Sequence, residues 1–441
     1  MRKYLFLILL LGVHLFLLLN LQFTAWPEML SYPYLKNHGF LLYRDMIHPY
    51  PPLLTLVLSW LYKFLGYKLM VMKIFTWSLI LANDVLVFLI VNKLTKKLAP
   101  SLWALIVYIL TQPFLEGNML WFDNVIVTPI LLGTFFMLQK KYFWAGLSLA
   151  LAALTKQTAG LFLVLGIAYL VFQRSKIKNL TSFLAGPVVL GLVLGFRLLT
   201  ENQFTDFINW TLIYPATKWG QFPGYIDLAL SQRELVVLVL LVLPAFAALR
   251  LRRGKPVILF WYFLVSLVMI YPRFSFFHAQ TAIAFVAIIF GLVTSRARLT
   301  YLLLIIVAIS LPAIRLNWQK PPRFYGANEQ QLAQVIKNKT ASDDKIYLLN
   351  LSSQYYVLAD HLPAKPWSDN FGWYFAMPGV EEELILRWEK NPPSVIFWRD
   401  AEPGAWWELG TYEPPKLTNF IRANYTRKEE IQKGIWLWRK N

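Results

Sequence analysis

Long apolar runs are the feature of this 441-residue sequence that most constrains its fold. Runs of about 15 to 25 residues recur between residues 4 and 314, and a helix of roughly 20 residues is needed to cross the hydrocarbon core of a bilayer. Apolar residues make up 57% of the chain and charged residues only 15%, whereas charged residues are about 25% of a typical soluble protein. The pattern predicts an all-α polytopic membrane protein.

Short basic clusters separate the apolar runs and predict their orientation. Residues 1–314 hold 26 Lys and Arg against nine Asp and Glu, and 16 of these positive residues lie in six clusters. The clusters are Arg2/Lys3, Lys93/Lys96/Lys97, Lys140/Lys141, Arg174/Lys176/Lys178, Arg250/Arg252/Arg253/Lys255 and Arg296/Arg298. Every second loop is basic, as is typical of cytoplasmic loops. This topology accounts for the net charge of +19, so we expect no nucleic-acid partner.

The alternation of loops predicts about 11 transmembrane helices in the cell (plasma) membrane, with a cytoplasmic N-terminus and an extracytoplasmic C-terminus. The predicted spans cover residues 4–22, 67–91, 101–114, 124–139, 142–155, 157–172, 180–198, 234–249, 256–271, 279–294 and 299–314. Three outer segments, residues 23–66, 115–123 and 199–233, are longer than simple turns. In the first of them, Pro51-Pro52 before residues 53–65 predicts a helix that lies on the membrane surface.

The composition changes after Arg315 to that of a soluble domain. We therefore expect two domains, a transmembrane domain of residues 1–314 and a small extracytoplasmic α/β domain of residues 315–441. The tail shows candidate strands and amphipathic helices in alternation. The strands are Lys345–Leu351, Val395–Arg399 and Gly434–Arg439, and the helices lie near 328–338, 380–390 and 416–424. The chain has no cysteine, which excludes disulfides, a thiol nucleophile and a Cys-based metal site.

Asp45 is the first candidate for a catalytic group. Eight of the nine acids in residues 1–314 fall on the predicted outer side, and Asp45 lies there in Tyr43-Arg44-Asp45-Met46-Ile47-His48, just beyond the first span. A carboxylate in this position can act as a general base, with Arg44 and His48 as neighbouring binding residues. The alternative is a loop ion pair between Arg44 and Asp45. The ninth acid, Asp84, lies deep in the second span and is expected to answer a polar group of a neighbouring helix.

Further polar residues map to the outer ends of other predicted spans. They are Glu116, Asp123, Lys156, Gln157, Arg273 and His278. Lys and Arg can hold a phosphate leaving group while an acid accepts a proton from a hydroxyl nucleophile, which suits sugar transfer from a lipid phosphate. Each residue also has a structural explanation: the acids can cap spans, Lys156 can extend to the interface, Arg273 can anchor a span, and His278 can be a satisfied histidine at a helix start.

Motifs of soluble enzymes are absent from the sequence. It has no Gly-rich phosphate loop, no His-Glu-x-x-His and no Ser-centred elbow, so a cytoplasmic nucleotide-sugar donor is disfavoured. Two alternatives to an enzyme stay open: a transporter or flippase of lipid-linked sugars, and a non-catalytic cell-envelope assembly subunit. A transporter is expected to show repeated halves and polar residues at mid-membrane, and the sequence shows no repeat.

Four stretches resemble the integral membrane glycosyltransferases of the C-type (GT-C) fold, the group that includes protein O-mannosyltransferases and aminoarabinose transferases (family 39-like). The stretches are Gly39–Pro52, Phe122-Asp123, Leu154-Thr155-Lys156-Gln157, and Tyr271-Pro272-Arg273 with His278. The resemblance covers roughly residues 1–314.

The resemblance implies a sugar donor linked to polyprenyl phosphate, chemistry at the outer membrane face, and inversion at the anomeric carbon. It implies that Asp45 is the base, that Asp123 is a later loop acid, and that Lys156 and Arg273 bind the lipid phosphate. The acceptor is expected to be a protein, a lipid or a glycan. Many members have two acids close together in the first loop, whereas Asp45 stands alone here. The sequence therefore identifies no cofactor with certainty, and the use of a divalent metal stays open.

Overall fold

The computed structural model describes residues 2–248, 257–293, 298–405 and 408–441, which divide into two units. We call the first the helical unit, which comprises Met1–Thr24, Met72–Gly195 and Leu228–Arg323. The second, the mixed unit, comprises Ala25–Val71, Phe196–Asp227 and Phe324–Asn441. The tail after residue 323 thus belongs to the same unit as the segment that follows the first helix.

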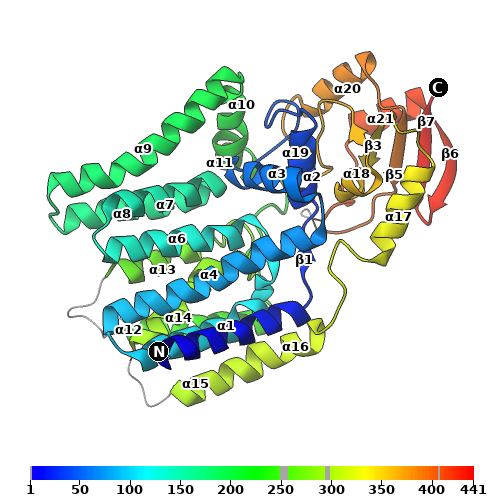
Figure 1. Cartoon of the computed structure of the whole chain (residues 1–441). Helices are drawn as coiled ribbons and strands as arrows, with labels where there is room; N and C mark the ends of the chain where they lie inside the picture. Colours follow the sequence, from blue (N-terminus) through cyan, green and yellow to red (C-terminus); the bar gives the residue numbers. More distant parts are fainter. Residues whose placement is uncertain (1, 249–256, 294–297, 406–407) are drawn as a thin grey trace. The chain divides into compact units, whose positions relative to one another are not determined.

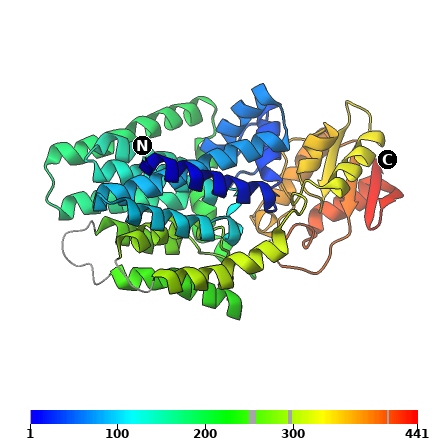
Figure 2. The same ribbon diagram turned by 60° about the horizontal axis from the view of Figure 1, so that its bottom comes forward.

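The helical unit consists of long apolar helices that run along a common direction (Figures 1 and 2). Its helices are α1 (Arg2–Asn20), α4 (Leu69–Thr95), α5 (Leu98–Thr111), η1 (Pro113–Gly117), α6 (Phe122–Leu138), α7 (Tyr142–Thr155), η2 (Gln157–Ala159), α8 (Gly160–Phe172), α9 (Ile177–Thr200), α12 (Gln232–Ala248), α13 (Ile258–Val268), α14 (Gln280–Leu292), α15 (Arg298–Ile305), η5 (Ile306–Ser310) and α16 (Leu311–Asn317). The short strands β1 (Thr24–Ala25) and β2 (Met119–Leu120) lie between helices in the sequence.

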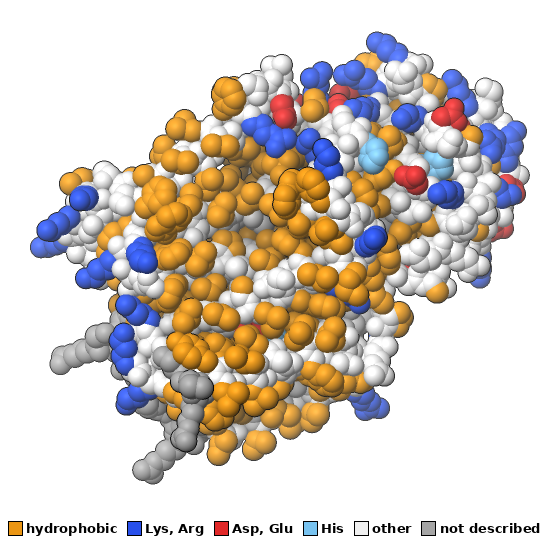
Figure 3. Space-filling view, in the orientation of Figure 1, with side chains coloured by type: hydrophobic (Ala, Val, Ile, Leu, Met, Phe, Trp, Pro, Cys, Tyr) orange, Lys and Arg blue, Asp and Glu red, His pale blue; other side chains and the backbone are white. Residues whose placement is uncertain are grey.

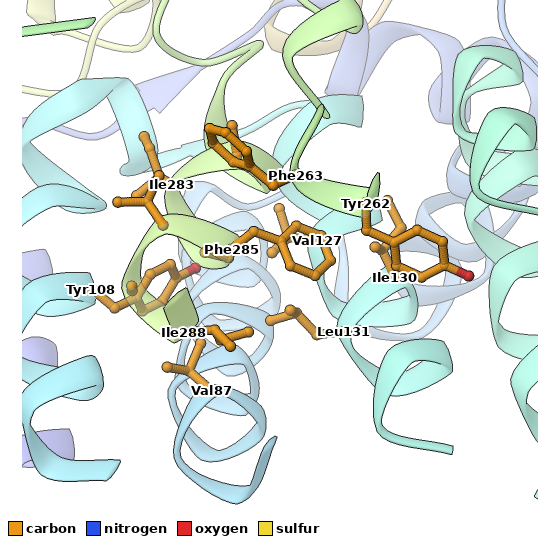
Figure 4. Close-up of a cluster of buried hydrophobic side chains, with 14 of the residues drawn as sticks. Val87, Tyr108, Val127, Ile130, Leu131, Tyr262, Phe263, Ile283, Phe285 and Ile288 are labelled. Atoms are coloured by element: carbon orange, nitrogen blue, oxygen red, sulfur yellow. The ribbon is translucent and has the colours of Figure 1, made fainter. Parts of the chain in front are cut away.

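Helix α14 forms the centre of the helical unit. All of its residues are buried, and it packs against α5, α6, α12 and α13. Figure 4 shows Ile283, Phe285 and Ile288 of α14 among apolar side chains of neighbouring helices, including Val127 of α6 and Phe263 of α13. A helix that is apolar on every side is either enclosed by other helices or faces lipid, and the burial of every residue of α14 shows that it is enclosed. The loop that precedes α14 is therefore held on a rigid support.

Helices occur at all 11 predicted spans within the described residues. Three of these helices, Leu69–Thr95, Ile177–Thr200 and Leu299–Asn317, are long and apolar enough to cross a membrane by length and composition. Most others have 10 to 17 residues. The positions of the helices are thus as predicted.

Basic side chains gather at one end of the helical unit, on the left in Figure 3, while apolar side chains cover the flanks of its helices. The N-terminus, the turn from α8 to α9 and the start of α15 lie at this same end in Figure 1. The predicted basic cluster at 250–255 and Arg296 lie outside the described residues. The arrangement agrees with loops that share one side of a membrane.

The mixed unit combines three separate parts of the chain. The first part contains α2 (Glu28–Asn37) and α3 (Leu53–Leu65), and α3 is the helix expected after Pro51-Pro52. The second contains α10 (Phe204–Ile208), η3 (Asn209–Ile213), α11 (Tyr214–Thr217) and η4 (Trp219–Gln221). The tail contains α17 (Ala327–Asn338), β3 (Lys345–Leu349), α18 (Gln354–Ala359), β4 (Leu362–Pro363), α19 (Gly372–Phe375), α20 (Val380–Lys390), β5 (Val395–Arg399), α21 (Pro415–Asn424), β6 (Tyr425–Gln432) and β7 (Ile435–Lys440).

A five-stranded sheet organises the tail, with the order β4-β3-β5-β7-β6 among the described residues. Strand β3 is parallel to β4 and β5, whereas β7 is antiparallel to β5 and β6. The three predicted strands and three predicted helices are all found. Strand β6 was not predicted, because its residues Tyr-Thr-Arg-Lys-Glu-Glu-Ile-Gln are mostly exposed and lack an apolar alternation.

Candidate active site

Asp123 lies at the start of α6, where the positive end of the helix dipole favours an acid. Its Oδ1 atom is 2.5 Å from Nζ of Lys156, and its Oδ2 atom is 3.1 Å from Nδ1 of His278. Asp123 and Lys156 are 1% and 8% exposed. We call these three residues the Asp123 cluster. The structure thus brings together an acid and two bases that are far apart in the sequence.

Lys156 and His278 reach Asp123 from the ends of two helix connections. Lys156 is in an extended conformation between α7 and η2, and Gln157 follows it as the first residue of η2. His278 lies two residues before α14. Burial lowers the pKa of the His278 imidazole, although the Asp123 carboxylate opposes this shift. The positive charge that faces Asp123 near pH 7 therefore comes mainly from Lys156.

Glu116 connects two loops beside this cluster. Its Oε2 atom accepts hydrogen bonds from Oγ of Ser275 at 2.5 Å and from the backbone N–H of Phe277 at 3.1 Å. The guanidinium of Arg273, two residues before Ser275, lies 6.0 Å from the centre of the Phe277 ring. Glu116 therefore orders the segment that carries Arg273 and His278.

Asp45 belongs to the mixed unit and is held by the tail of the chain. Its Oδ2 atom accepts hydrogen bonds from the backbone N–H of Leu41 at 3.0 Å and from Nζ of Lys365 at 2.9 Å. The Asp45 carbonyl accepts from the Trp367 N–H at 2.9 Å, and the Ile47 N–H donates to the Trp367 carbonyl at 3.2 Å. The side chain of Asp45 is 20% exposed. The Asp45 loop is thus hydrogen-bonded to residues 365–367.

The ion-pair partner of Asp45 is Lys365, whereas the sequence suggested Arg44. Lys365 also donates to the Gly39 carbonyl at 2.6 Å and lies 4.6 Å from the centre of the Phe40 ring. Arg44 instead faces Asp206 of α10, where its charge opposes the burial that raises the pKa of Asp206. Lys365 was not predicted as a site residue, since nothing in the sequence relates residue 365 to residue 45.

His48 is fully buried, and both nitrogens of its ring contact neighbouring groups of the protein. Its Nδ1 atom is 2.7 Å from the Tyr50 carbonyl and its Nε2 atom is 2.7 Å from the Thr55 hydroxyl. The carbonyl can only accept, so Nδ1 carries the proton and Nε2 accepts from Thr55. Burial lowers the pKa of His48 to about 4. A neutral imidazole with both nitrogens engaged holds the Asp45 loop against α3.

Metal ligands do not gather in the part of the chain that the structure describes. No group of three or more His, Asp or Glu side chains there is arranged to hold a metal ion.

Comparisons with known proteins define the class of this fold. The crystal structure of ArnT from Cupriavidus metallidurans bound to undecaprenyl phosphate aligns with a TM-score of 0.60 at 12% identity, over 98% of this chain and 97% of that chain. The apo structure of the same ArnT aligns with a TM-score of 0.55 at 11% identity, over 99% and 98%. A search of curated proteins gives no match. The chain therefore has the fold of an integral membrane glycosyltransferase of the C type.

The particular family follows from the sequence itself. The model of glycosyltransferase family 87 matches residues 48–272, which is just over half of the chain. The chain belongs to glycosyltransferase family 87 and is an integral membrane protein. The resemblance to C-type membrane glycosyltransferases seen in the four sequence stretches is thereby confirmed.

Proposed function

We propose that this glycosyltransferase moves a sugar from a polyprenyl-phosphate donor to an acceptor hydroxyl at the outer face of the membrane, with inversion and with Asp45 as the base. The observation that carries the proposal is the difference between the two acids. Asp45 is partly exposed and fixed by Leu41, whereas Asp123 is buried against Lys156. A base must reach the proton that it removes, and Asp45 meets this condition better.

The donor phosphate is assigned to the helical unit. Arg273 and Lys156 supply the positive charge, with His278 and Gln157 as further contacts, while Glu116 and Asp123 hold these residues in place. ArnT, which shares the fold, has been crystallised with undecaprenyl phosphate, and this supports a lipid phosphate as donor. Phosphate is a good leaving group, so positive charge beside it reduces the need for a second catalytic acid. Arg44 is assigned to the acceptor side of Asp45.

The proposal includes 11 spans with the N-terminus in the cytoplasm and the domain of residues 315–441 outside. Basic side chains at one end of the helical unit support this orientation. A membrane-surface position of α3 is supported by Trp60 and Phe64, which are exposed on the face opposite its buried residues.

The direct test is transfer by purified protein in lipid vesicles, with a panel of polyprenyl-phosphate sugars and hydroxyl acceptors. We expect transfer by the wild type, and a fall of about two to four orders of magnitude in Asp45→Asn, which keeps the shape of the side chain but removes its basicity. Donor binding should persist, because the phosphate contacts lie elsewhere. Glu389→Gln, which changes an exposed acid of the mixed unit on α20, serves as the control.

Near-normal turnover in Asp45→Asn would reject Asp45 as the base and make Asp123 or Glu116 the better candidate. Movement of intact donor across the vesicle membrane without sugar transfer would support a flippase instead. Absence of both transfer and movement in a folded wild-type protein would favour a non-catalytic assembly subunit.

A further inference from the structure

A buried His–Asp pair lies inside the helical unit and has no part in the proposed mechanism. Nδ1 of His14 in α1 is 2.8 Å from Oδ2 of Asp84 in α4, and both residues are fully buried. The other imidazole nitrogen, Nε2, is 3.2 Å from Oε1 of Gln112 at the end of α5. Such a pair is costly to bury, so it is expected to serve a purpose.

The hydrogen bonds determine how many protons the pair carries. The amide nitrogen of Gln112 donates to the Gly117 carbonyl at 3.0 Å, which leaves Oε1 of Gln112 as an acceptor toward His14. Nε2 of His14 must therefore carry a proton. The contact between Nδ1 and Asp84 needs a second proton, which either atom can carry. In both arrangements the His14–Asp84 pair is neutral overall, and a neutral pair is the less costly one to bury.

Gln112 transmits the position of this pair to the loop that carries Glu116. The Gly117 carbonyl accepts from Gln112 and also from the Asn124 side chain at 2.8 Å. Gly117 has no room for a side chain, because an added Cβ would lie 2.0 Å from the Gln112 carbonyl. Glu116 has a positive φ of 55°, which is unfavourable for a residue with a side chain and must be enforced by its surroundings.

We propose that the neutral His14–Asp84 pair is a positioning device that, through Gln112, holds the loop 112–118 so that the Glu116 carboxylate binds Ser275 and the Phe277 N–H. The links are hydrogen bonds within the helical unit, together with the peptide bond that joins Glu116 to Gly117. His14 and Asp84 touch no substrate in this proposal. Their effect on turnover rests on the proposed function, whereas their effect on the loop does not.

Hydrogen–deuterium exchange of the full-length protein in lipid nanodiscs tests the positioning directly. In His14→Phe and Asp84→Leu, we expect exchange in peptides covering 112–118 and 274–279 to become about tenfold faster. Asp84→Asn should stay within about twofold of the wild type, because its amide can donate to Nδ1 of a neutral His14. Thr134→Val is the matched control, since the buried Thr134 hydroxyl bonds only to Ile130 within α6 among the described contacts.

Gln112→Met keeps the proposal testable if the first two variants fail to fold, because it cuts the chain of hydrogen bonds and leaves the pair intact. Unchanged exchange in a folded Gln112→Met would overturn the positioning role. Equal exchange in Asp84→Asn and Asp84→Leu would overturn the neutral pair.

Turnover separates this inference from the proposed function. Displacement of the loop should lower the rate of transfer by up to about a hundredfold. It should also weaken donor affinity, because Glu116 holds the segment that carries Arg273 and His278, and Asp84→Asn should restore both quantities. If the wild type transfers no sugar, the proposed function fails, and the exchange experiment still decides the role of His14 and Asp84.

Discussion

The Asp123 cluster and the Asp45 loop place carboxylates in opposite settings. In the helical unit, Asp123 is buried, and helix ends hold Lys156 and His278 against it. In the mixed unit, Asp45 stays partly exposed on a loop, and its partner Lys365 is 45% exposed. The first arrangement fixes charge in a rigid position, which suits recognition of an anion. The second leaves a carboxylate accessible to a proton donor, which suits a base.

The largest effect that this comparison predicts is on stability, from breaking the buried pair. Lys156→Met leaves the Asp123 carboxylate with His278 alone, so we expect a loss of about 3 to 5 kcal/mol in unfolding free energy. The double variant Lys156→Met/Asp123→Asn should recover part of this loss, because no unpaired charge remains. Chemical or thermal unfolding in detergent measures both.

Arg387→Met is the control for that experiment, because Arg387 pairs with Glu383 on the surface at 3.9 Å and should matter by less than about 0.5 kcal/mol. Equal losses in Lys156→Met and Arg387→Met would remove the distinction between a buried and an exposed ion pair.

A second prediction concerns two buried acids of the mixed unit, Glu28 and Asp369. Burial raises the pKa of Glu28 from 4.5 to about 7, and burial together with the charge of Glu28 raises the pKa of Asp369. The folded protein thus keeps a proton that the unfolded chain releases. The contribution of Glu28 to the free energy of unfolding is therefore fully present below pH 4.5. It falls by about 3 kcal/mol as the pH rises to 7.

The pH dependence of the unfolding free energy between pH 4.5 and 7 measures this effect. Glu28→Gln should flatten the slope, whereas Glu389→Gln, on the exposed side of α20, should leave it unchanged. A slope that is the same in wild type and Glu28→Gln would contradict the prediction. The helical and mixed units would then differ only in the burial of their ion pairs, and not in the pH dependence of their buried acids.

A third prediction tests recognition of the donor by the helical unit. Arg273→Gln should weaken binding of a polyprenyl-phosphate sugar by about 10- to 100-fold, since a hydrogen bond to a charged group contributes about 1.5 to 3 kcal/mol. Arg273→Lys should also weaken binding if the guanidinium contacts two phosphate oxygens. Arg174→Gln, exposed at the end of α8, is the control. Unchanged affinity in both Arg273 variants would return Arg273 to the role of an interface anchor.

The difference between the two regions also explains what could be predicted from the sequence. Apolar runs located the helices, and the short, almost wholly apolar run Val395–Arg399 located β5, because these patterns are local. Asp123, Lys156 and His278 could be placed at the same end of the bundle, but only packing of three helix connections determines that they touch.

Contacts between distant parts of the chain were not predictable from local patterns. Lys365 contacts Asp45 across 320 residues, and the neighbour in sequence, Arg44, faces Asp206 instead. Asp84 was expected to pair with a polar group on another helix, and that group is the His14 imidazole. The position of Asp84 deep in a predicted span indicated that it needs a polar partner, but the identity of that partner depends on how α1 packs against α4.

The smallest predicted effect is that of Lys365 on Asp45. An exposed ion pair contributes less than about 1 kcal/mol, so Lys365→Met should change stability by that amount at most and turnover by less than about fivefold. The backbone hydrogen bonds to Trp367 and Leu41 hold the Asp45 loop without Lys365. The same unfolding and transfer assays measure both quantities, with Lys339→Met as the control, because the side chains of Lys339 and its partner Glu429 are both exposed. A loss of turnover as severe as that of Asp45→Asn would mean that Lys365 itself contacts the substrate, and the base would then act as one half of a charged pair.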